Sequence, residues 1–247
     1  MSRASSWLKG EIEDYKQLLR SIPGLTLSIF ILSVVCANLM ANKELLSYKY
    51  LAMDSGYAFS WLMFLCMDII CKRWGARASI KVSLLALAVN LVVFLSFNLL
   101  SRTNGMWGAY YATENIEVNE ALNATFGGTW YVVFGSALAF AVSSVVNALL
   151  NSGIGRHVGE KGFGAFALRS YVSTIIGQLV DNLVFSTVVS KFFFGWTWTQ
   201  VIACSATGAL FELLFEIIFS GFGYKIVSGW ERDGVGKEYL EGKEQAR

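Results

Sequence analysis

The chain has 247 residues, of which 55% are hydrophobic and 15% are charged, and its net charge is +2. Because soluble domains carry about a quarter of their residues as charges, this composition excludes an ordinary soluble protein. The small net charge and the lack of a basic tract argue against nucleic acid as a partner. The partner that this composition predicts is the lipid bilayer.

Six apolar runs are long enough to cross a membrane. A helix needs about 20 mostly apolar residues to span the hydrocarbon core. The runs lie near residues 24–42, 57–71, 79–100, 130–150, 167–190 and 200–226. The sequence therefore predicts an all-α, polytopic membrane protein with six transmembrane helices in one domain over residues 23–227.

The distribution of lysine and arginine predicts the orientation. With a cytoplasmic N-terminus, 16 of the 20 basic residues fall in the cytoplasmic segments 1–23, 72–81, 151–169 and 225–247. Only Lys43, Lys49, Arg102 and Lys191 fall outside. Because basic residues concentrate on the cytoplasmic side, both termini are expected in the cytoplasm and the protein in the inner, cytoplasmic membrane.

The first 22 residues predict a surface helix. Trp7, Leu8, Ile12 and Tyr15 recur at helical spacing with charged residues between them, which is typical of an amphipathic helix lying on a membrane. Both signs of charge and the lack of a cleavage site are atypical of a signal peptide. Pro23 suits the first turn of the next helix.

Two polar segments flank the later spans. The exterior segment 101–129 is rich in aromatic residues and has two interpretations: an aromatic belt at the headgroup level, or a lid over an entrance to the bundle. Glu114, Glu117 and Glu120 suggest a short helix within it. Residues 228–247 are polar, and they predict a frayed, solvated cytoplasmic tail.

The residues that bind cofactors are scarce. The four cysteines lie in or at the ends of predicted spans, and their spacing matches no zinc pattern. His157 is the only histidine, which excludes a bis-histidine haem within one chain. We therefore expect no cofactor, no metal and no disulfide framework.

Polar side chains inside the spans are the main functional signal. A charged residue at the centre of a membrane helix costs about 2.5–3.5 kcal/mol on insertion scales, so such residues face the bundle interior and often mark a permeation path. The acids are Asp68, Asp181, Glu212 and Glu216, and the amides are Asn38, Asn90, Asn98, Asn147, Gln178 and Asn182.

The fifth span carries the densest polar pattern. Arg169, Ser173, Gly177 and Asp181 follow one another at intervals of one helical turn, and Gln178 borders this face. The small residues would let a ligand or a helix approach closely. Gln178 and Asp181 side by side would suit the polar edge of a heterocycle; the plain alternative is that they hold helices together.

The other acids have two interpretations each. Asp68 precedes Lys72 by one turn, so an ion pair along the helix is the simple one. Glu212 and Glu216 lie on one face of the last span, where two close carboxylates would share a proton. We regard Glu212 and Glu216, with Asp181, as candidates for proton coupling. The alternative for the two glutamates is pairing with a basic residue of another helix.

A short internal repeat links two spans. Residues 142–147 resemble residues 176–181, and in each run a small residue precedes Asn147 or Asp181 by four positions. Transporters often carry internal repeats with the binding site at their interface.

The motifs of the second and fifth spans resemble a known family. Asp68, Lys72, Gly75 and Arg77 end the second span, and the fifth contains Arg169, Ser173, Gly177, Gln178, Asp181 and Phe185. With Asn38 near the end of the first span, this pattern resembles the vitamin uptake transporter (VUT) family, also described as queuosine precursor transporters. Lys72, Ser144 and Asn147 depart from the acids and glutamine that many members carry there.

The resemblance implies import of a 7-deazapurine such as preQ0, preQ1 or queuine, a precursor of the modified tRNA base queuosine. It makes Gln178 and Asp181 the main contacts to the base edge and Asn147 their partner. We add Asn38, Asp68, Asn182 and Arg169 as further candidate binding residues. The aromatic candidates for stacking on the ring are Trp61, Phe64, Trp107 and Phe185.

Four hypotheses compete at this point. The first is a stand-alone secondary transporter for a queuosine precursor. The second is a substrate-binding subunit for another vitamin-like molecule that relies on a separate ATP-driven module, since the chain has no P-loop. An intramembrane enzyme would need an Asp181–Glu216 dyad, and no catalytic motif accompanies it, so we expect no enzyme. The fourth is a membrane scaffold. A homo-oligomer is compatible with each.

Overall fold

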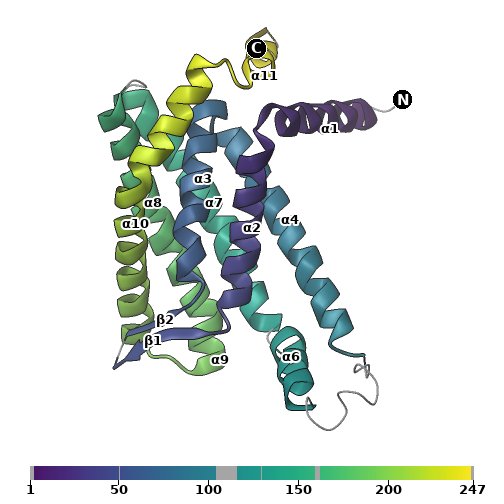
Figure 1. The fold of residues 1–247 in the computed structure, drawn as a ribbon, viewed down its shortest axis with the longest axis vertical. Coiled ribbons are helices and arrows are strands. Elements are labelled where there is room, and N and C mark those ends of the chain that lie inside the picture. Colours follow the sequence, from purple (N-terminus) through teal and green to yellow (C-terminus); the bar gives the residue numbers. More distant parts are fainter. Residues whose placement is uncertain (1–2, 50, 104–115, 129, 159–161, 246–247) are drawn as a thin grey trace.

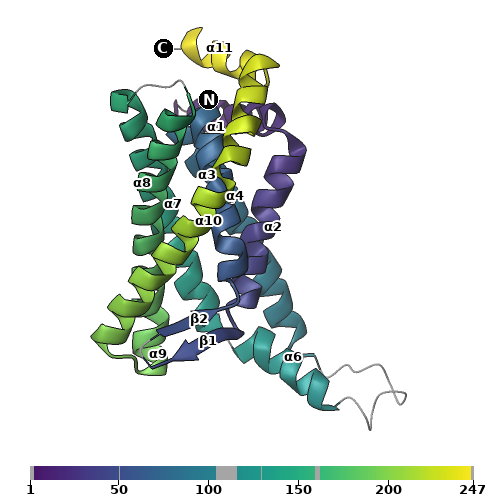
Figure 2. The same ribbon diagram turned by 60° about the vertical axis from the view of Figure 1, so that its left-hand side comes forward.

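The computed structural model describes the whole chain except residues 1–2, 50, 104–115, 129, 159–161 and 246–247. Long helices run side by side, with both termini near one end of the bundle and a small β-hairpin at the other (Figure 1). A second view, turned by 60°, shows the same arrangement, with α6 (Ile116–Gly128) splayed away from the bundle at the hairpin end (Figure 2).

In the part of the chain that the structure describes, six long helices form the bundle, in the order that the apolar runs predict. They are α2 (Gly24–Met40), α3 (Tyr57–Trp74), α4 (Ala76–Leu100), α7 (Trp130–Val158), α8 (Phe163–Phe185) and α10 (Trp198–Arg232). The shorter elements are α1 (Arg3–Ser21), β1 (Glu44–Tyr48), β2 (Leu51–Asp54), α6 (Ile116–Gly128), the π-helix η1 (Ser186–Lys191), α9 (Phe192–Phe194) and α11 (Lys237–Gln245).

Local sequence signals set several of these boundaries. Gly75 alone separates α3 from α4, and its φ of 87° lies in the left-handed region that glycine adopts without a steric penalty. Thr197 and Gln200 form a capping box that satisfies free N–H groups at the start of α10. Pro23 stands just before α2, which begins at Gly24.

The helices form a bundle centred on α3, α7, α8 and α10. Helix α8 packs between α7 and α10, α3 packs against α10 and α2, and α4 packs against α7 and α2. The main hydrophobic cluster includes Phe30, Phe64, Met67 and Ile70. Leu18 of α1 is also fully buried in it, so the amphipathic helix is anchored to the bundle.

Four helical runs in the described part of the chain are long and apolar enough to cross a membrane: α4, α7, Phe163–Phe194 and α10. A fifth is added if α1 and α2, which are bent by 103° relative to each other, count as one broken span. A multi-pass, α-helical membrane fold is thereby confirmed.

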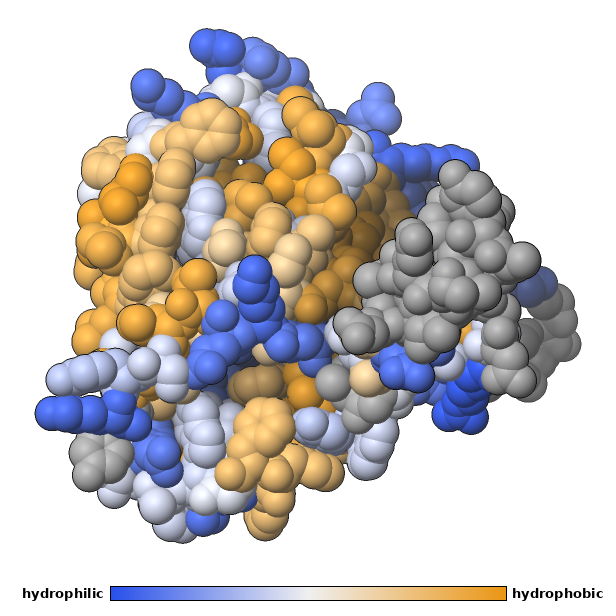
Figure 3. All heavy atoms as spheres, turned by 60° about the horizontal axis from the view of Figure 1, so that its bottom comes forward, coloured by the Kyte–Doolittle hydropathy of each residue, from blue (hydrophilic) through white to orange (hydrophobic). Residues whose placement is uncertain are grey.

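The bundle has an apolar outside and a polar inside. Large hydrophobic side chains such as Leu95, Phe134, Ile202 and Phe222 are exposed, and apolar surface covers much of the flank in Figure 3. The buried polar side chains include Asp68, Asn147, Ser170, Thr174, Gln178, Asn182, Glu212 and Glu216. This distribution suits a lipid-facing surface around an internal polar path.

Two parts of the structure differ from the sequence expectations. The connection after the first span forms the antiparallel hairpin β1–β2. The tail is not frayed: α10 continues to Arg232 and α11 follows. The tail has partners, because Arg73 donates to the Val235 carbonyl at 2.6 Å and Lys243 forms an ion pair with Asp14 at 2.7 Å. These contacts hold it against α3 and α1.

Candidate functional site

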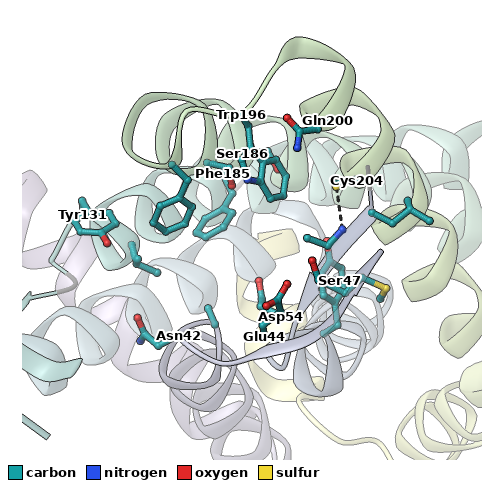
Figure 4. A pocket seen from close by; sticks show the side chains of 18 of the residues that line it. Asn42, Glu44, Ser47, Asp54, Tyr131, Phe185, Ser186, Trp196, Gln200 and Cys204 are labelled. Carbon is teal, nitrogen blue, oxygen red and sulfur yellow. Dashed lines mark hydrogen bonds between the residues drawn. The ribbon is translucent and has the colours of Figure 1, made fainter. Parts of the chain in front are cut away.

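A cavity of about 460 Å³ lies at the hairpin end of the bundle, which is a size typical of small-molecule sites. The hairpin and the adjoining ends of α7, α8 and α10 form its walls. Phe185 and Trp196 lie on one side of it, and Asp54 and Glu44 face them from the other (Figure 4). The cavity therefore combines aromatic rings with carboxylates.

A narrower cavity of about 70 Å³ continues the first toward the middle of the bundle. Ala41, Asp54, Tyr57 and Phe185 line both cavities, so the two cavities adjoin at these residues. The polar groups that line the inner part include Asn38 from α2, Asp181 and Asn182 from α8, and Glu212 from α10. These are four of the residues that sequence analysis selected.

Asp54 stands where the two cavities meet. Its carboxylate accepts a hydrogen bond from the Gly56 N–H at 2.7 Å. Burial raises the pKa of Asp54 to about 7, the Gly56 bond opposes this change, and the nearby charge of Asp181 adds to it. Asp54 therefore changes its charge near neutral pH.

This pKa predicts a pH-dependent stability. An acid whose pKa is raised by folding contributes stability that is fully present below its unfolded pKa and is lost as the pH rises through its folded pKa. The melting temperature should therefore fall as the pH rises from about 4 to about 7 and then level off. Asp54→Asn should reduce this slope in thermal melts; an unchanged slope would show that Asp54 is not the titrating group.

Glu212 is the centre of a hydrogen-bonded cluster at the wall of the inner cavity. It accepts from Ser60 Oγ and, at 3.3 Å, from Asn182 Nδ2. With its amide nitrogen turned toward Glu212, Gln178 donates to the two carboxylate oxygens at 3.2 and 2.7 Å. Tyr57 donates to the Asn182 Oδ1 at 3.2 Å. This cluster ties α3, α8 and α10 together at the end of the cavity.

Gln178 and Asp181 have different surroundings. Asp181 accepts a hydrogen bond from Ser143 Oγ at 2.6 Å and lines the inner cavity. Gln178 is fully buried against Glu212 and does not line either cavity. Asp181 is therefore the member of this predicted pair that is placed to meet a ligand directly.

The two runs of the internal repeat pack against each other. Ser143 of the first run donates to Asp181 of the second. Likewise, Gly177 of the second run lies against Asn147 of the first. A Cβ added to Gly177 would be 3.0 Å from the Asn147 Cβ. The small residue of each run faces the polar residue of the other, as expected at a repeat interface.

A second polar cluster surrounds Asp68, one to two helical turns from the first. Asn147 Nδ2 donates to the Asp68 carboxylate at 2.8 Å, Ser170 Oγ at 2.5 Å and Thr174 Oγ1 at 3.2 Å. Ser170 Oγ also hydrogen-bonds Glu216 Oε1. Glu216 thus shares its partner with Asp68, whereas Glu212 belongs to the cluster at the cavity.

Arg169 lies beyond this cluster, toward the end of the bundle that holds the termini. Its guanidinium donates to the backbone and side-chain oxygens of Asn151 at 3.2 and 2.9 Å. A Cβ on Gly155 would overlap the guanidinium, so this glycine makes room for it. Arg169 is separated from the described cavities and does not line them.

The predicted aromatic residues are dispersed. Phe185 lines both cavities. Phe64 is buried in the core, and Trp61 stacks on Phe219 at a centroid distance of 4.3 Å. Trp107 lies outside the described residues. Phe185 is the one of the three described candidates that is placed to stack on a ligand.

Sequence reasoning missed Asp54, Tyr57, Ser60, Ser143 and Ser170. Asp54 and Tyr57 stand in or beside a connection, where a polar residue is unremarkable. The hydroxyls are common in membrane helices and carry no charge. The repeat was the only signal for any of them, because it includes Ser143.

A comparison with family models identifies the class of protein. The family described as "Putative vitamin uptake transporter" matches residues 54–226, from Asp54 at the cavity to the last turns of α10. The chain belongs to this vitamin uptake transporter family. The match confirms the resemblance seen in the second and fifth spans. No curated protein and no solved structure matches the chain.

Proposed function

We propose that this protein imports a queuosine precursor, a 7-deazapurine such as preQ1, across the inner membrane. The observation that carries the proposal is a cavity with aromatic and acidic walls that adjoins a second cavity lined by Asp181 and Glu212 inside an apolar bundle. Membership of the vitamin uptake transporter family supports it.

The proposed topology has six spans with both termini in the cytoplasm. Helix α2 has 17 residues, which is about the minimum for a span. Helix α3 carries Asp68, Lys72 and Arg73, of which the first is buried and the others stand in the last turn. The bias of basic residues places the termini inside, so α1 lies along the cytoplasmic surface and the cavity opens to the exterior.

The chemistry of the cavity fits a flat, nitrogen-rich ring. Phe185 offers a stacking face, and the carboxylate of Asp181 is an acceptor for the N–H groups of a guanine-like edge, a charge-assisted contact. Asn38 Oδ1 is buried at the inner cavity without a hydrogen-bond partner among the described residues. It supplies a further acceptor.

The acids also favour a substrate with a positive charge. Glu44, Asp54, Asp181 and Glu212 line the two cavities, against Lys49 as the one basic residue among the described lining residues. preQ1 carries an amine that preQ0 lacks, so preQ1 gains electrostatic attraction from these carboxylates.

Binding to the detergent-purified protein tests this proposal. A ligand that binds only the folded state stabilises it by about 2.7 kcal/mol at a hundredfold excess over Kd. We expect a rise in melting temperature with preQ1, a smaller rise with preQ0, and none with unrelated vitamins. A folded protein that responds to a vitamin and to no deazapurine would contradict the proposed substrate.

A further inference from the structure

Three buried side chains meet in the second polar cluster, away from the cavity. Asp68 of α3, Ser170 of α8 and Glu216 of α10 are each fully buried. Ser170 Oγ is within hydrogen-bond distance of both carboxylates. None of the three lines either cavity at the hairpin end.

The number of available hydrogens decides the charge of this group. A serine hydroxyl has one hydrogen to donate, so it is able to donate to only one of the two carboxylates. Two carboxylates that share one partner in a low-dielectric interior do not both ionise readily. The second contact of Ser170 is therefore a hydrogen bond that it accepts from a protonated carboxyl group.

The other contacts place that proton on Glu216. Asp68 accepts from Asn147 and Thr174 in addition to Ser170, and such donors stabilise an ionised carboxylate. Glu216 Oε2, by contrast, is buried with no hydrogen-bond partner among the residues that the structure describes. An ionised Glu216 would leave this charged oxygen unsatisfied, which is costly.

We propose that Asp68, Ser170 and Glu216 form a proton-binding site in which Glu216 carries the proton, uses it to donate a hydrogen bond to Ser170 Oγ, and releases the proton to the cytoplasm during each transport cycle. Ser170 in turn donates its own hydrogen to the ionised Asp68. The role of this site in coupling proton release to transport rests on the proposed transport function, whereas the presence of a proton on Glu216 does not.

The neighbouring charged and titratable groups are compatible with a proton on Glu216. Cys66 and Cys71 of α3 interact electrostatically with the acids, Cys66 with Glu216 and Cys71 with Asp68. Arg169 of α8 hydrogen-bonds Asn151 of α7. On their own helices, Lys72 follows Asp68 and Glu212 precedes Glu216 by one turn.

Helix α8 connects the proton site with the substrate cavity. Thr174 contacts Asp68, and Gln178, one turn later, contacts Glu212 at the end of the cavity. Helix α10 makes the same connection through Glu216 and Glu212. A change of charge at Glu216 therefore acts on α10, which carries Glu212, and on α8, which contacts Glu212 through Gln178, and this provides a physical link between proton and substrate.

Infrared spectroscopy of the purified protein tests the site without a substrate. A protonated carboxyl group has a C=O stretching band that a carboxylate lacks. At neutral pH we expect Glu216→Gln to reduce the intensity of this band by the contribution of one carboxyl group. Glutamine keeps a hydrogen-bond donor to Ser170, so the substitution preserves that contact. Glu231→Gln, an exposed change on the same helix, should leave the band unchanged. An unchanged band in Glu216→Gln would overturn the proposal.

Uptake into liposomes tests the coupling. We expect the wild type to accumulate preQ1 under an inward proton gradient, and Glu216→Gln to reach only equal concentrations on both sides. Accumulation that ignores the proton gradient, or follows a sodium gradient, would overturn the coupling. A protein that moves no deazapurine would instead refute the proposed function, while the infrared result would still decide whether Glu216 carries a proton.

Discussion

Asp181→Asn is expected to remove most of the affinity for the deazapurine. The change keeps the size of the side chain and its position beside Ser143, but it removes the negative charge at the inner cavity. Hydrogen bonds to charged groups contribute about 1.5–3 kcal/mol, which corresponds to a roughly 10- to 150-fold rise in Kd. Titration calorimetry with preQ1 measures this change directly.

Asp233→Asn provides the matched control. Asp233 is exposed beyond α10 and forms an ion pair with Arg232, so its replacement should leave the Kd unchanged. Both variants should melt cooperatively, which separates lost binding from lost folding. An Asp181→Asn protein that is folded and binds preQ1 as tightly as the wild type would remove Asp181 from the site.

Gly208→Ala is expected to destabilise the protein and to distort the cavity. A Cβ at this position of α10 would overlap the hydroxyl and the ring of Tyr57. Tyr57 lines both cavities and donates to Asn182, so its displacement breaks a contact at the proposed site. Overpacking of this kind costs about 1–3 kcal/mol, and we expect the affinity for preQ1 to fall as well.

Gly221→Ala, on the same helix, is the control for this change. No atom outside its own helix lies within 4 Å of the Cβ that would be added there. Alanine is a better helix former than glycine by about 1 kcal/mol, so the melting temperature should stay equal or rise. Equal stability and equal affinity in the two variants would show that the contact between Gly208 and Tyr57 is unimportant.

The helices of the bundle were predictable because the bilayer imposes a length and a composition on each span. The ends of the helices were less predictable: α7 extends to Val158 and α10 to Arg232. A helix is able to continue past the hydrocarbon core because polar residues are tolerated there. The β-hairpin was missed because β1 is exposed along its whole length. An exposed strand has no alternation of burial for the sequence to reveal.

The site was predictable in its residue types and less so in its pairings. Asn38, Asp181, Asn182 and Glu212 stand out because polar groups inside a span need a reason to be there, and all four line the inner cavity. The contact between Gln178 and Glu212 depends on how α8 and α10 are rotated against each other. The sequence periodicity of one helix does not determine that rotation.

We propose that this chain alone moves a queuosine precursor through the bundle. The most direct test is uptake of labelled preQ1 by liposomes that contain only the purified protein, with empty liposomes and Asp181→Asn as references. We expect saturable uptake by the wild type that is lost in Asp181→Asn and absent from empty liposomes. A folded, inserted protein that moves no deazapurine, or moves preQ1 equally well as Asp181→Asn, would contradict it.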